Sequence, residues 1–381
     1  MKTYPKWLSA AVLSAMLASP AAALETKAKN VILMDYDTGE YLFAENAFVP
    51  VAPASMSKLM TVYVLFSKLK DGTLSLEDVF SVSENAWRTG GAASGSSTMF
   101  LPIGSKVTVE NLIKGIIIQS GNDACIVAAE NIAGSEEDFA ELMNAKAKEL
   151  GLKNSHFVNS TGLPHPDHRM SAEDLARLAQ ALIRDFPEYY SVFSQKSFTY
   201  NNILQGNRNP LLYSMPDADG LKTGHTAEAG FCLTASVKRG DRRLIGVMTG
   251  LKSNKERSEE AEKLMNWGFR EFNNYKVFKQ FQRIVSVPVY MGEEKSIDLA
   301  VDEDVIMTIA RSKARDVKLT AVYEKPVKAP VAQGDKLGEV KIEIPGGEVK
   351  TVPLYADHSI RKLGFWGRIL SNVKYLLFGA E

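Results

Sequence analysis

The sequence has few of the residues that build disulfide scaffolds and metal sites. It contains two cysteines, Cys125 and Cys232, and five histidines in 381 residues. Two cysteines are too few for a disulfide framework, and because both lie in apolar surroundings we expect two buried free thiols. The histidines form no His-Glu-x-x-His motif and no cluster with the cysteines. We therefore expect neither a metal site nor a cofactor.

An excess of charge of one sign is also absent, since 45 Lys and Arg balance 45 Asp and Glu. A nucleic-acid partner would require a concentrated basic face, so we expect none. The first apolar run, Leu8 to Ala18, is too short to span a bilayer. Lys2 and Lys6 flank its start and Ala21-Ala22-Ala23 follow it, a pattern that predicts a secretory signal peptide over residues 1–23.

Three short motifs occur in an order that describes one active site. They are Ser55-Met56-Ser57-Lys58, Ser120-Gly121-Asn122 and Lys222-Thr223-Gly224. Together they supply a serine nucleophile, a lysine one helical turn away, a second hydroxyl with an amide, and a second ammonium group. This combination indicates acyl transfer through a covalent serine ester.

The Ser-x-x-Lys pattern alone is weak. It also occurs at Ser67–Lys70, Ser359–Lys362 and Ser371–Lys374. Context favours Ser55, because it follows Ala52-Pro53-Ala54, where a helix can start, whereas Ser67 lies late in the same predicted helix.

The spacing of the first motif suggests how the serine is activated. Positions i and i+3 share one face of a helix, so Lys58 should meet Ser55. A lysine is a base only when it is neutral; burial lowers its pKa, and a nearby cation such as Lys222 lowers it further. We expect Ser120 and Asn122 to hold Lys58 through hydrogen bonds.

The third motif is expected on an edge strand that follows the Asp219-Gly220 turn. Gly224 would leave room for a substrate backbone, and Lys222 and Thr223 would bind a carboxylate. Strand-edge amides, with the backbone N–H of Ser55, would bind a tetrahedral oxyanion.

The order of the predicted elements indicates an α+β catalytic domain over residues 24–276, an antiparallel sheet with surrounding helices. Turn residues and helix-capping motifs in the sequence predict where its hairpins and helices begin and end. We predict hairpins at 31–43 and 231–249, and helices at about 53–70, 109–118, 123–132, 136–150, 172–186 and 255–272. Residues 277–356 read as short strands separated by Pro and Gly, which predicts a small β-sandwich domain without a catalytic constellation.

The last segment, residues 357–381, predicts an amphipathic membrane anchor. On a helical wheel, Trp366 lies on one apolar face and Arg361 and Arg368 lie opposite. No acid occurs between Asp357 and Glu381. An apolar face among acyl chains and a basic face toward anionic headgroups would follow. A helix that docks the same face on protein is the alternative.

In its three motifs and its domain order the chain resembles a low-molecular-mass penicillin-binding protein, specifically a serine-type D-alanyl-D-alanine carboxypeptidase. The segments that carry the resemblance are residues 53–61, 120–125 and 219–226, together with the order of signal, catalytic domain, β-domain and tail. The motif set is the one shared by these proteins and serine β-lactamases. The resemblance covers essentially the whole mature chain.

The resemblance implies a role for each motif residue. Ser55 would be acylated by the penultimate D-alanine of a peptidoglycan stem pentapeptide, with release of the terminal D-alanine, and water would hydrolyse the ester. Lys58 would be the base, Ser120 would relay protons, and Asn122 would position the substrate. Lys222, Thr223 and Arg208 would bind the terminal carboxylate, Gly224 would leave room for the substrate backbone, and the backbone of His225 would complete the oxyanion hole.

The resemblance also implies context for the enzyme. Residues 90–97 resemble a mobile active-site loop, and Pro210 stands where the family pattern has glycine. β-Lactam antibiotics would acylate the same serine. The enzyme would be exported and held peripherally at the periplasmic face of the inner membrane.

Three other functions remain open on the sequence. A serine β-lactamase shares the motifs, but a soluble enzyme that hydrolyses β-lactams would have no use for a β-domain and a membrane tail. A peptidoglycan DD-endopeptidase would cut cross-links with the same residues. A non-catalytic wall-binding protein is disfavoured by the complete motif set. The sequence leaves homodimer formation open.

Overall fold

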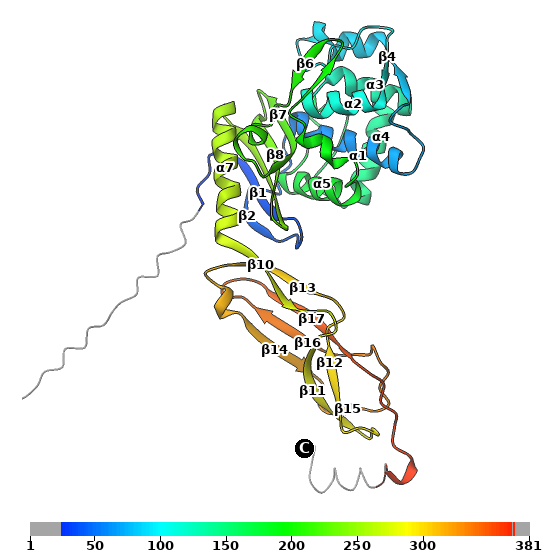
Figure 1. The fold of residues 1–381 in the computed structure, drawn as a ribbon, viewed down its shortest axis with the longest axis vertical. Helices are drawn as coiled ribbons and strands as arrows, with labels where there is room; N and C mark the ends of the chain where they lie inside the picture. The colour runs from blue at the N-terminus through cyan, green and yellow to red at the C-terminus, as the bar shows by residue number, and fades with distance from the viewer. Residues whose placement is uncertain (1–23, 368, 370–381) are drawn as a thin grey trace, which may run out of the picture.

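The structure is a computed structural model, and it describes residues 24–367 and residue 369. The signal peptide predicted over residues 1–23, and most of the basic and apolar positions of the predicted anchor, lie outside the described residues. Figure 1 shows a mixed helix-and-sheet domain and a domain made mainly of strands lying end to end along the long axis. The predicted fold class is confirmed: an α+β domain followed by a β-domain.

A five-stranded antiparallel sheet forms the centre of the first domain. Its order is β2-β1-β9-β8-β7. Both predicted hairpins are present, because β1 pairs with β2 and β8 with β9. The strands span Asn30–Asp35 (β1), Tyr41–Glu45 (β2), Ala218–Thr226 (β7), Gly230–Arg239 (β8) and Arg242–Leu251 (β9). The strand β7 lies at the edge, as predicted for the segment that carries Lys222-Thr223-Gly224.

Each face of this sheet is covered by helices. Side chains alternate between faces along a strand, so Val31 and Leu33 of β1 pack toward α7 (Asn254–Glu271), whereas Ile32 and Met34 enter the core shared with the other helices. Figure 1 shows the sheet between α7 on one side and α1 and α5 on the other. The large helical core thereby holds the first two motifs against one side of the sheet.

The helical layer follows the predicted capping signals. Ser135 accepts a hydrogen bond from the N–H of Asp138, and Ser171 accepts one from the N–H of Asp174, so each serine caps the helix that follows it. The helices span Lys58–Lys70 (α1), Val109–Lys114 (α2), Asn122–Ala133 (α3), Glu136–Glu149 (α4), Ala172–Asp185 (α5) and Leu211–Ser214 (α6). Short helical turns cover Ala54–Ser57, Ala86–Gly90, Ala92–Ser94, Gly115–Gln119 and Tyr190–Ser194. Two small hairpins complete the layer: Val79–Ser81 (β3) with Lys106–Thr108 (β4), and Ser197–Tyr200 (β5) with Ile203–Gly206 (β6).

The second domain begins at the end of α7. The strand β10 (Phe272–Phe278) pairs with β13 (Val305–Ala310), so the domain limit predicted at residue 276 lies within a strand of the β-domain. The larger sheet has the order β14-β16-β17-β12-β11-β15. Its strands span Arg283–Tyr290 (β11), Ser296–Ala300 (β12), Lys318–Tyr323 (β14), Val327–Lys328 (β15), Lys336–Glu343 (β16) and Val349–Ala356 (β17), with a helical turn at Ala314–Asp316.

The chain after β17 first packs onto this domain. Ile360 is 2% exposed and forms a β-bridge with Val331, and the N–H of Leu363 donates to the carbonyl of Met291 at 2.9 Å. The predicted anchor, which we started at residue 357, therefore begins with a stretch bound to the β-domain. Phe365 and Trp366 follow in a helical turn and are 64% and 80% exposed. Within residues 24–367 and 369, no helix is both long and apolar enough to cross a bilayer.

Candidate active site

The turn that carries Ser55 is a 3-10 helix, Ala54–Ser57, which leads directly into α1 at Lys58. We predicted a single helix from Pro53; the first turn is tighter. Ser55 is half-buried, whereas Lys58 is 0% exposed. Consequently the serine hydroxyl borders the surface while the amine beneath it is sealed from water.

Three oxygen atoms surround the amine of Lys58. Its Nζ lies 3.0 Å from Ser55 Oγ, 2.6 Å from Asn122 Oδ1 and 2.5 Å from the carbonyl oxygen of Thr161. The carbonyl and the amide oxygen only accept hydrogen bonds, whereas a hydroxyl can also donate. When the amine is neutral, its two N–H groups therefore satisfy Asn122 and Thr161, and its lone pair is left for the hydroxyl of Ser55.

Burial favours this neutral form. Burial, with a smaller contribution from the charge of Arg208, lowers the pKa of Lys58 to about 8. Burial and the charge of Lys58 hold the pKa of Lys222 well below its usual range. We expected Lys222 to lower the pKa of Lys58; the two buried ammonium groups disfavour each other's charge, and Arg208 adds a further cation near both.

Ser120 is hydrogen-bonded to Lys222 of the third motif. Lys222 Nζ donates to Ser120 Oγ at 2.9 Å and to the carbonyl of Thr223 at 3.0 Å. Ser120 adopts a left-handed conformation with φ of 65° at the end of the Gly115–Gln119 turn. We expected both Ser120 and Asn122 to hold Lys58; Asn122 does so, and Ser120 is the partner of Lys222.

Gly224 allows β7 to approach the serine turn closely. A Cβ atom at this position would lie 3.0 Å from the Cβ of Ala54, 3.1 Å from the carbonyl of Pro53 and 3.3 Å from the nitrogen of Met56. We expected Gly224 to make room for substrate, but the crowded side is the turn that carries Ser55. The glycine therefore sets the separation between the first and third motifs.

The loop over residues 90–97 is bonded to the second motif. The N–H of Asn122 donates to the carbonyl of Ser97 at 2.7 Å, and Asn122 Nδ2 donates to Ser96 Oγ at 2.9 Å. Asp123 then accepts from Thr98 Oγ1 at 2.6 Å and from the N–H of Met99 at 2.9 Å. One turn of α3 therefore orients both the lysine and this loop.

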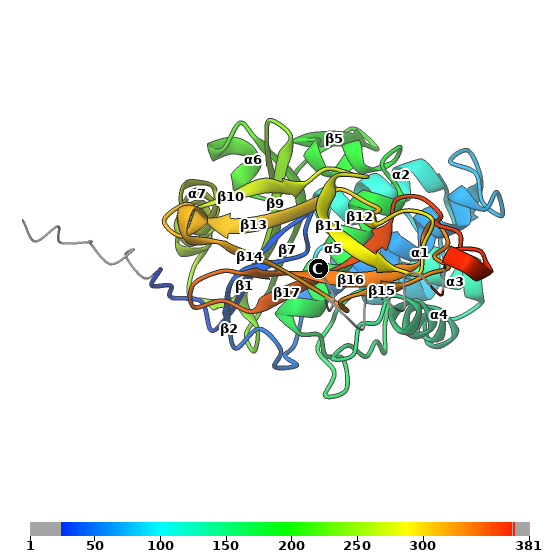
Figure 2. The same cartoon turned by 90° about the horizontal axis from the view of Figure 1, so that it is seen from below.

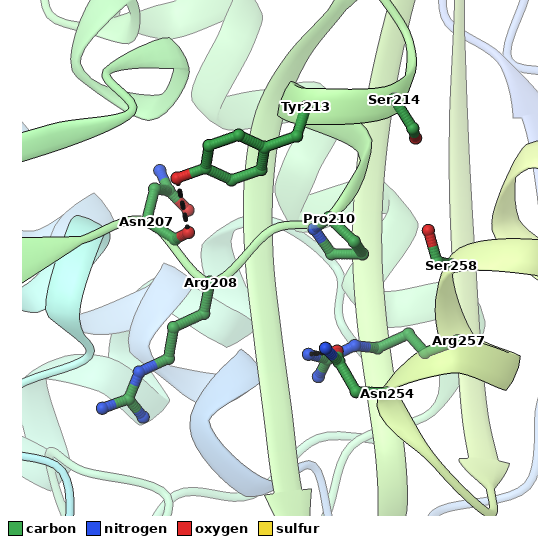
Figure 3. A pocket seen from close by; sticks show the side chains of 8 residues that line it. All are labelled: Asn207, Arg208, Pro210, Tyr213, Ser214, Asn254, Arg257 and Ser258. Atoms are coloured by element: carbon green, nitrogen blue, oxygen red, sulfur yellow. Dashed lines mark hydrogen bonds between the residues drawn. The ribbon is translucent and has the colours of Figure 1, made fainter.

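Arg208, in the segment between β6 and α6, contacts the same loop. Its Nη1 donates to Ser97 Oγ at 2.5 Å. It also borders a hollow of about 600 Å³, in which Tyr213 lies on one side and Arg257 on the other (Figure 3). Arg257 Nη1 donates to the carbonyls of Cys232 and Gly224 at 3.2 and 3.4 Å, so it supports β7 from behind. Pro210, where we noted a departure from the family pattern, caps α6 with φ of −66°.

The remaining predicted residues lie at the same edge. Thr223 is buried beside Lys222 on β7, and His225 is exposed with its ring stacked at 4.1 Å on Phe231. Cys125 and Cys232 are buried free thiols, and burial raises their pKa values to about 12 and about 11, so both stay protonated. The sequence-predicted site residues therefore gather along one edge of the sheet.

Two contributors were missed on the sequence. The Thr161 carbonyl gives no signal, because every residue has one, and Asn159-Ser160-Thr161 reads as a glycosylation acceptor. In the fold Asn159 Oδ1 instead accepts from Thr161 and Gly162, and Ser160 is fully buried. Asp123, the second, follows Asn122 directly and could have been singled out as the first acid of α3.

Comparison with known proteins agrees with the motifs. The family described as peptidase S11, D-alanyl-D-alanine carboxypeptidase, matches residues 16–253, and the C-terminal domain of penicillin-binding protein 5 matches residues 272–362. The chain is 42% identical to the D-alanyl-D-alanine carboxypeptidase DacC of Escherichia coli, covering 89% of this chain and 85% of the relative. It is 36% identical to DacF of Bacillus subtilis, covering 90% and 88%.

A solved structure extends the similarity to the whole fold. Penicillin-binding protein 5 from Haemophilus influenzae superposes with a TM-score of 0.80 at 37% identity, covering 89% of this chain and 99% of that one. Both domains and their order are therefore shared.

The electrostatics of the site can be measured on the free protein. We predict that Lys58 titrates with a pKa of about 8 in ¹³C NMR of its Cε, far below the ordinary 10.5. Replacing Arg208 by Gln should raise this pKa, because a cation near the amine is removed. Arg315→Gln, which removes an exposed charge from the β-domain, should leave it unchanged. A titration of Lys58 near 10.5 would contradict this account.

Proposed function

The chain belongs to the D-alanyl-D-alanine carboxypeptidase family, and from this premise we propose how its residues divide the reaction. It is a serine-type, penicillin-binding peptidase that removes the terminal D-alanine from peptidoglycan stem peptides. The observation that supports the residue assignment most strongly is the set of three oxygens around Lys58 Nζ.

Acylation starts from the neutral amine of Lys58. Its lone pair takes the hydroxyl proton of Ser55, and Oγ attacks the carbonyl carbon of the penultimate D-alanine. The backbone N–H groups of Ser55 and His225 stabilise the negative oxygen, and losing one such donor typically costs about 3 kcal/mol of barrier.

Collapse of the tetrahedral species breaks the peptide C–N bond. The leaving nitrogen takes the proton that Lys58 removed from Ser55, relayed through the hydroxyl of Ser120, so Lys58 is neutral again in the acyl-enzyme. Lys222 Nζ, 2.9 Å from Ser120 Oγ, orients that hydroxyl. Lys222, Thr223 and Arg208 bind the terminal carboxylate of the departing D-alanine. A bound carboxylate raises the pKa of Lys222, so substrate binding restores charge to that ammonium group.

Deacylation uses Lys58 and Ser55 again, with water as the attacking molecule. The neutral Lys58 takes a proton from water as the water oxygen attacks the ester carbonyl, and returns that proton to Ser55 Oγ as the ester C–O bond breaks. A β-lactam acylates Ser55 in the same way, because its strained amide resembles the peptide bond of the substrate. We find no counterpart of the extra glutamate that activates water in class A β-lactamases, so a β-lactam adduct should be long-lived.

The enzyme's setting is proposed from the ends of the chain. Residues 1–23 direct export, and the segment after Leu363 attaches the enzyme peripherally to the periplasmic face of the inner membrane. Exposed Phe365 and Trp366 support this proposal, because aromatic side chains are favoured at a membrane interface. A homodimer on the membrane remains compatible with this arrangement.

The nucleophile can be tested with an internal control. We predict that Ser55→Ala abolishes D-alanine release from a pentapeptide and removes the penicillin adduct seen by mass spectrometry. Ser67→Ala alters the other Ser-x-x-Lys of the same helix, where the hydroxyl donates to the Tyr63 carbonyl at 2.8 Å, and should retain activity. Full release by the Ser55 variant would refute the assignment. Rapid loss of the wild-type adduct would instead favour a β-lactamase.

Attachment through the tail can be tested by truncation. Because residues 357–363 pack on the β-domain, the cut should follow Leu363. We predict that the shortened mature chain remains in the supernatant with anionic vesicles, whereas the full mature chain sediments. Its kcat/KM for a soluble pentapeptide should be unchanged. Continued sedimentation of the shortened chain would argue against the anchor.

A further inference from the structure

Four arginines converge on a hollow at the junction of the two domains. The hollow measures about 380 Å³ and is lined by Arg239, Arg242, Arg270 and Arg311 together with Asn266 and Asn273. The β8–β9 hairpin, the last turns of α7 and the β10–β13 pair each contribute, so segments far apart in the chain meet here (Figures 1 and 2). The catalytic residues on β7 take no part in it.

Two of these guanidinium groups are fixed by the fold. Arg239 Nη2 donates to Asn266 Oδ1 at 2.7 Å, and its guanidinium carbon lies 4.6 Å from the centre of the Phe269 ring. Arg242 Nε donates to the buried carboxylate of Asp35 at 2.8 Å, and its Nη1 donates to the Phe272 carbonyl at 2.7 Å. The hollow is therefore held in shape by bonds within the first domain and by one, from Arg242 to Phe272, that reaches the first strand of the second domain.

Several donors of the hollow remain unused. Arg242 Nη2 is buried and has no hydrogen-bond partner among the described residues. Arg311 is exposed, and within the described part of the chain its side chain forms no ion pair. Arg270 is paired only through its Nε, with Glu271 at 2.7 Å. The three residues line the same hollow, and because Arg242 Nη2 is buried, the donors open to a ligand are those of Arg270 and Arg311.

The charge of the hollow is positive even with its acids included. The carboxylates that contact its arginines are Asp35, Asp217 and Glu271, so three negative groups stand against four guanidinium groups. Guanidinium donors in a fixed arrangement bind carboxylate or phosphate oxygens by paired hydrogen bonds. The site thus has the chemistry of an oxyanion receptor.

We propose that this hollow binds carboxylates of the cell wall, on a stem peptide other than the one in the active site. The inference rests on the enzyme's action on peptidoglycan, a polymer that presents stem-peptide carboxylates repeatedly. A second contact to the same polymer raises the effective concentration of stems at Ser55. A lipid headgroup fits the position less well, because the exposed helical turn over residues 365–367, red in Figure 1, lies at the opposite end of the β-domain.

The test compares polymeric and soluble substrates on the full mature chain. We expect Arg270→Gln/Arg311→Gln to bind purified sacculi about fivefold more weakly, since two exposed charge contacts are lost. D-Alanine release from sacculi should fall by the same factor. The kcat/KM for a soluble pentapeptide should stay at the wild-type value; a fall on both substrates would mean that the active site itself was damaged.

A matched variant controls for net charge. Lys325→Gln/Lys328→Gln also removes two exposed positive charges, at the β15 end of the β-domain, and should retain wild-type binding to sacculi. If the Arg270→Gln/Arg311→Gln variant bound sacculi as tightly as the wild type does, the proposal would be overturned. If the Arg270→Gln/Arg311→Gln variant bound anionic vesicles more weakly than the wild type but bound sacculi equally well, the proposal would be overturned in favour of a membrane contact.

Discussion

The whole active site depends on one buried amine. Lys58 is sealed from solvent and meets two oxygens that only accept hydrogen bonds, and one hydroxyl that can donate. Lowering its pKa from the ordinary 10.5 to about 8 corresponds to about 3 kcal/mol disfavouring its charged form. That free energy, supplied by burial, makes the amine a base at moderate pH, and the two acceptor oxygens aim its lone pair at Ser55.

The rest of the fold can be understood as support for this geometry. The serine turn opens α1, Asn122 opens α3, and the Thr161 carbonyl comes from the loop between α4 and α5. Gly224 lets the edge strand close against the serine turn without displacing it. Because these parts come from four separate segments, the site exists only when the helical layer and the sheet are packed together.

The sequence was informative where chemistry is local and less so where packing decides. Motif order, hairpin turns and serine caps are encoded by neighbouring residues, and these predictions agree with the structure. The Thr161 carbonyl has no side-chain signature. The effect of Arg208 on the charge of Lys58 depends on where the fold brings this residue, which spacing does not encode. Likewise, the burial of Ile360 against the β-domain depends on long-range packing that the local sequence does not encode.

The most direct test of the central claim is the rate of Ser55 acylation by a chromogenic penicillin as a function of pH. A base works in its neutral form, so the second-order rate constant should rise with pH and level off above an apparent pKa of about 8. A rate constant independent of pH between about 6 and 10, or one still rising near the ordinary lysine value, would contradict a neutral Lys58 as the group that activates the serine.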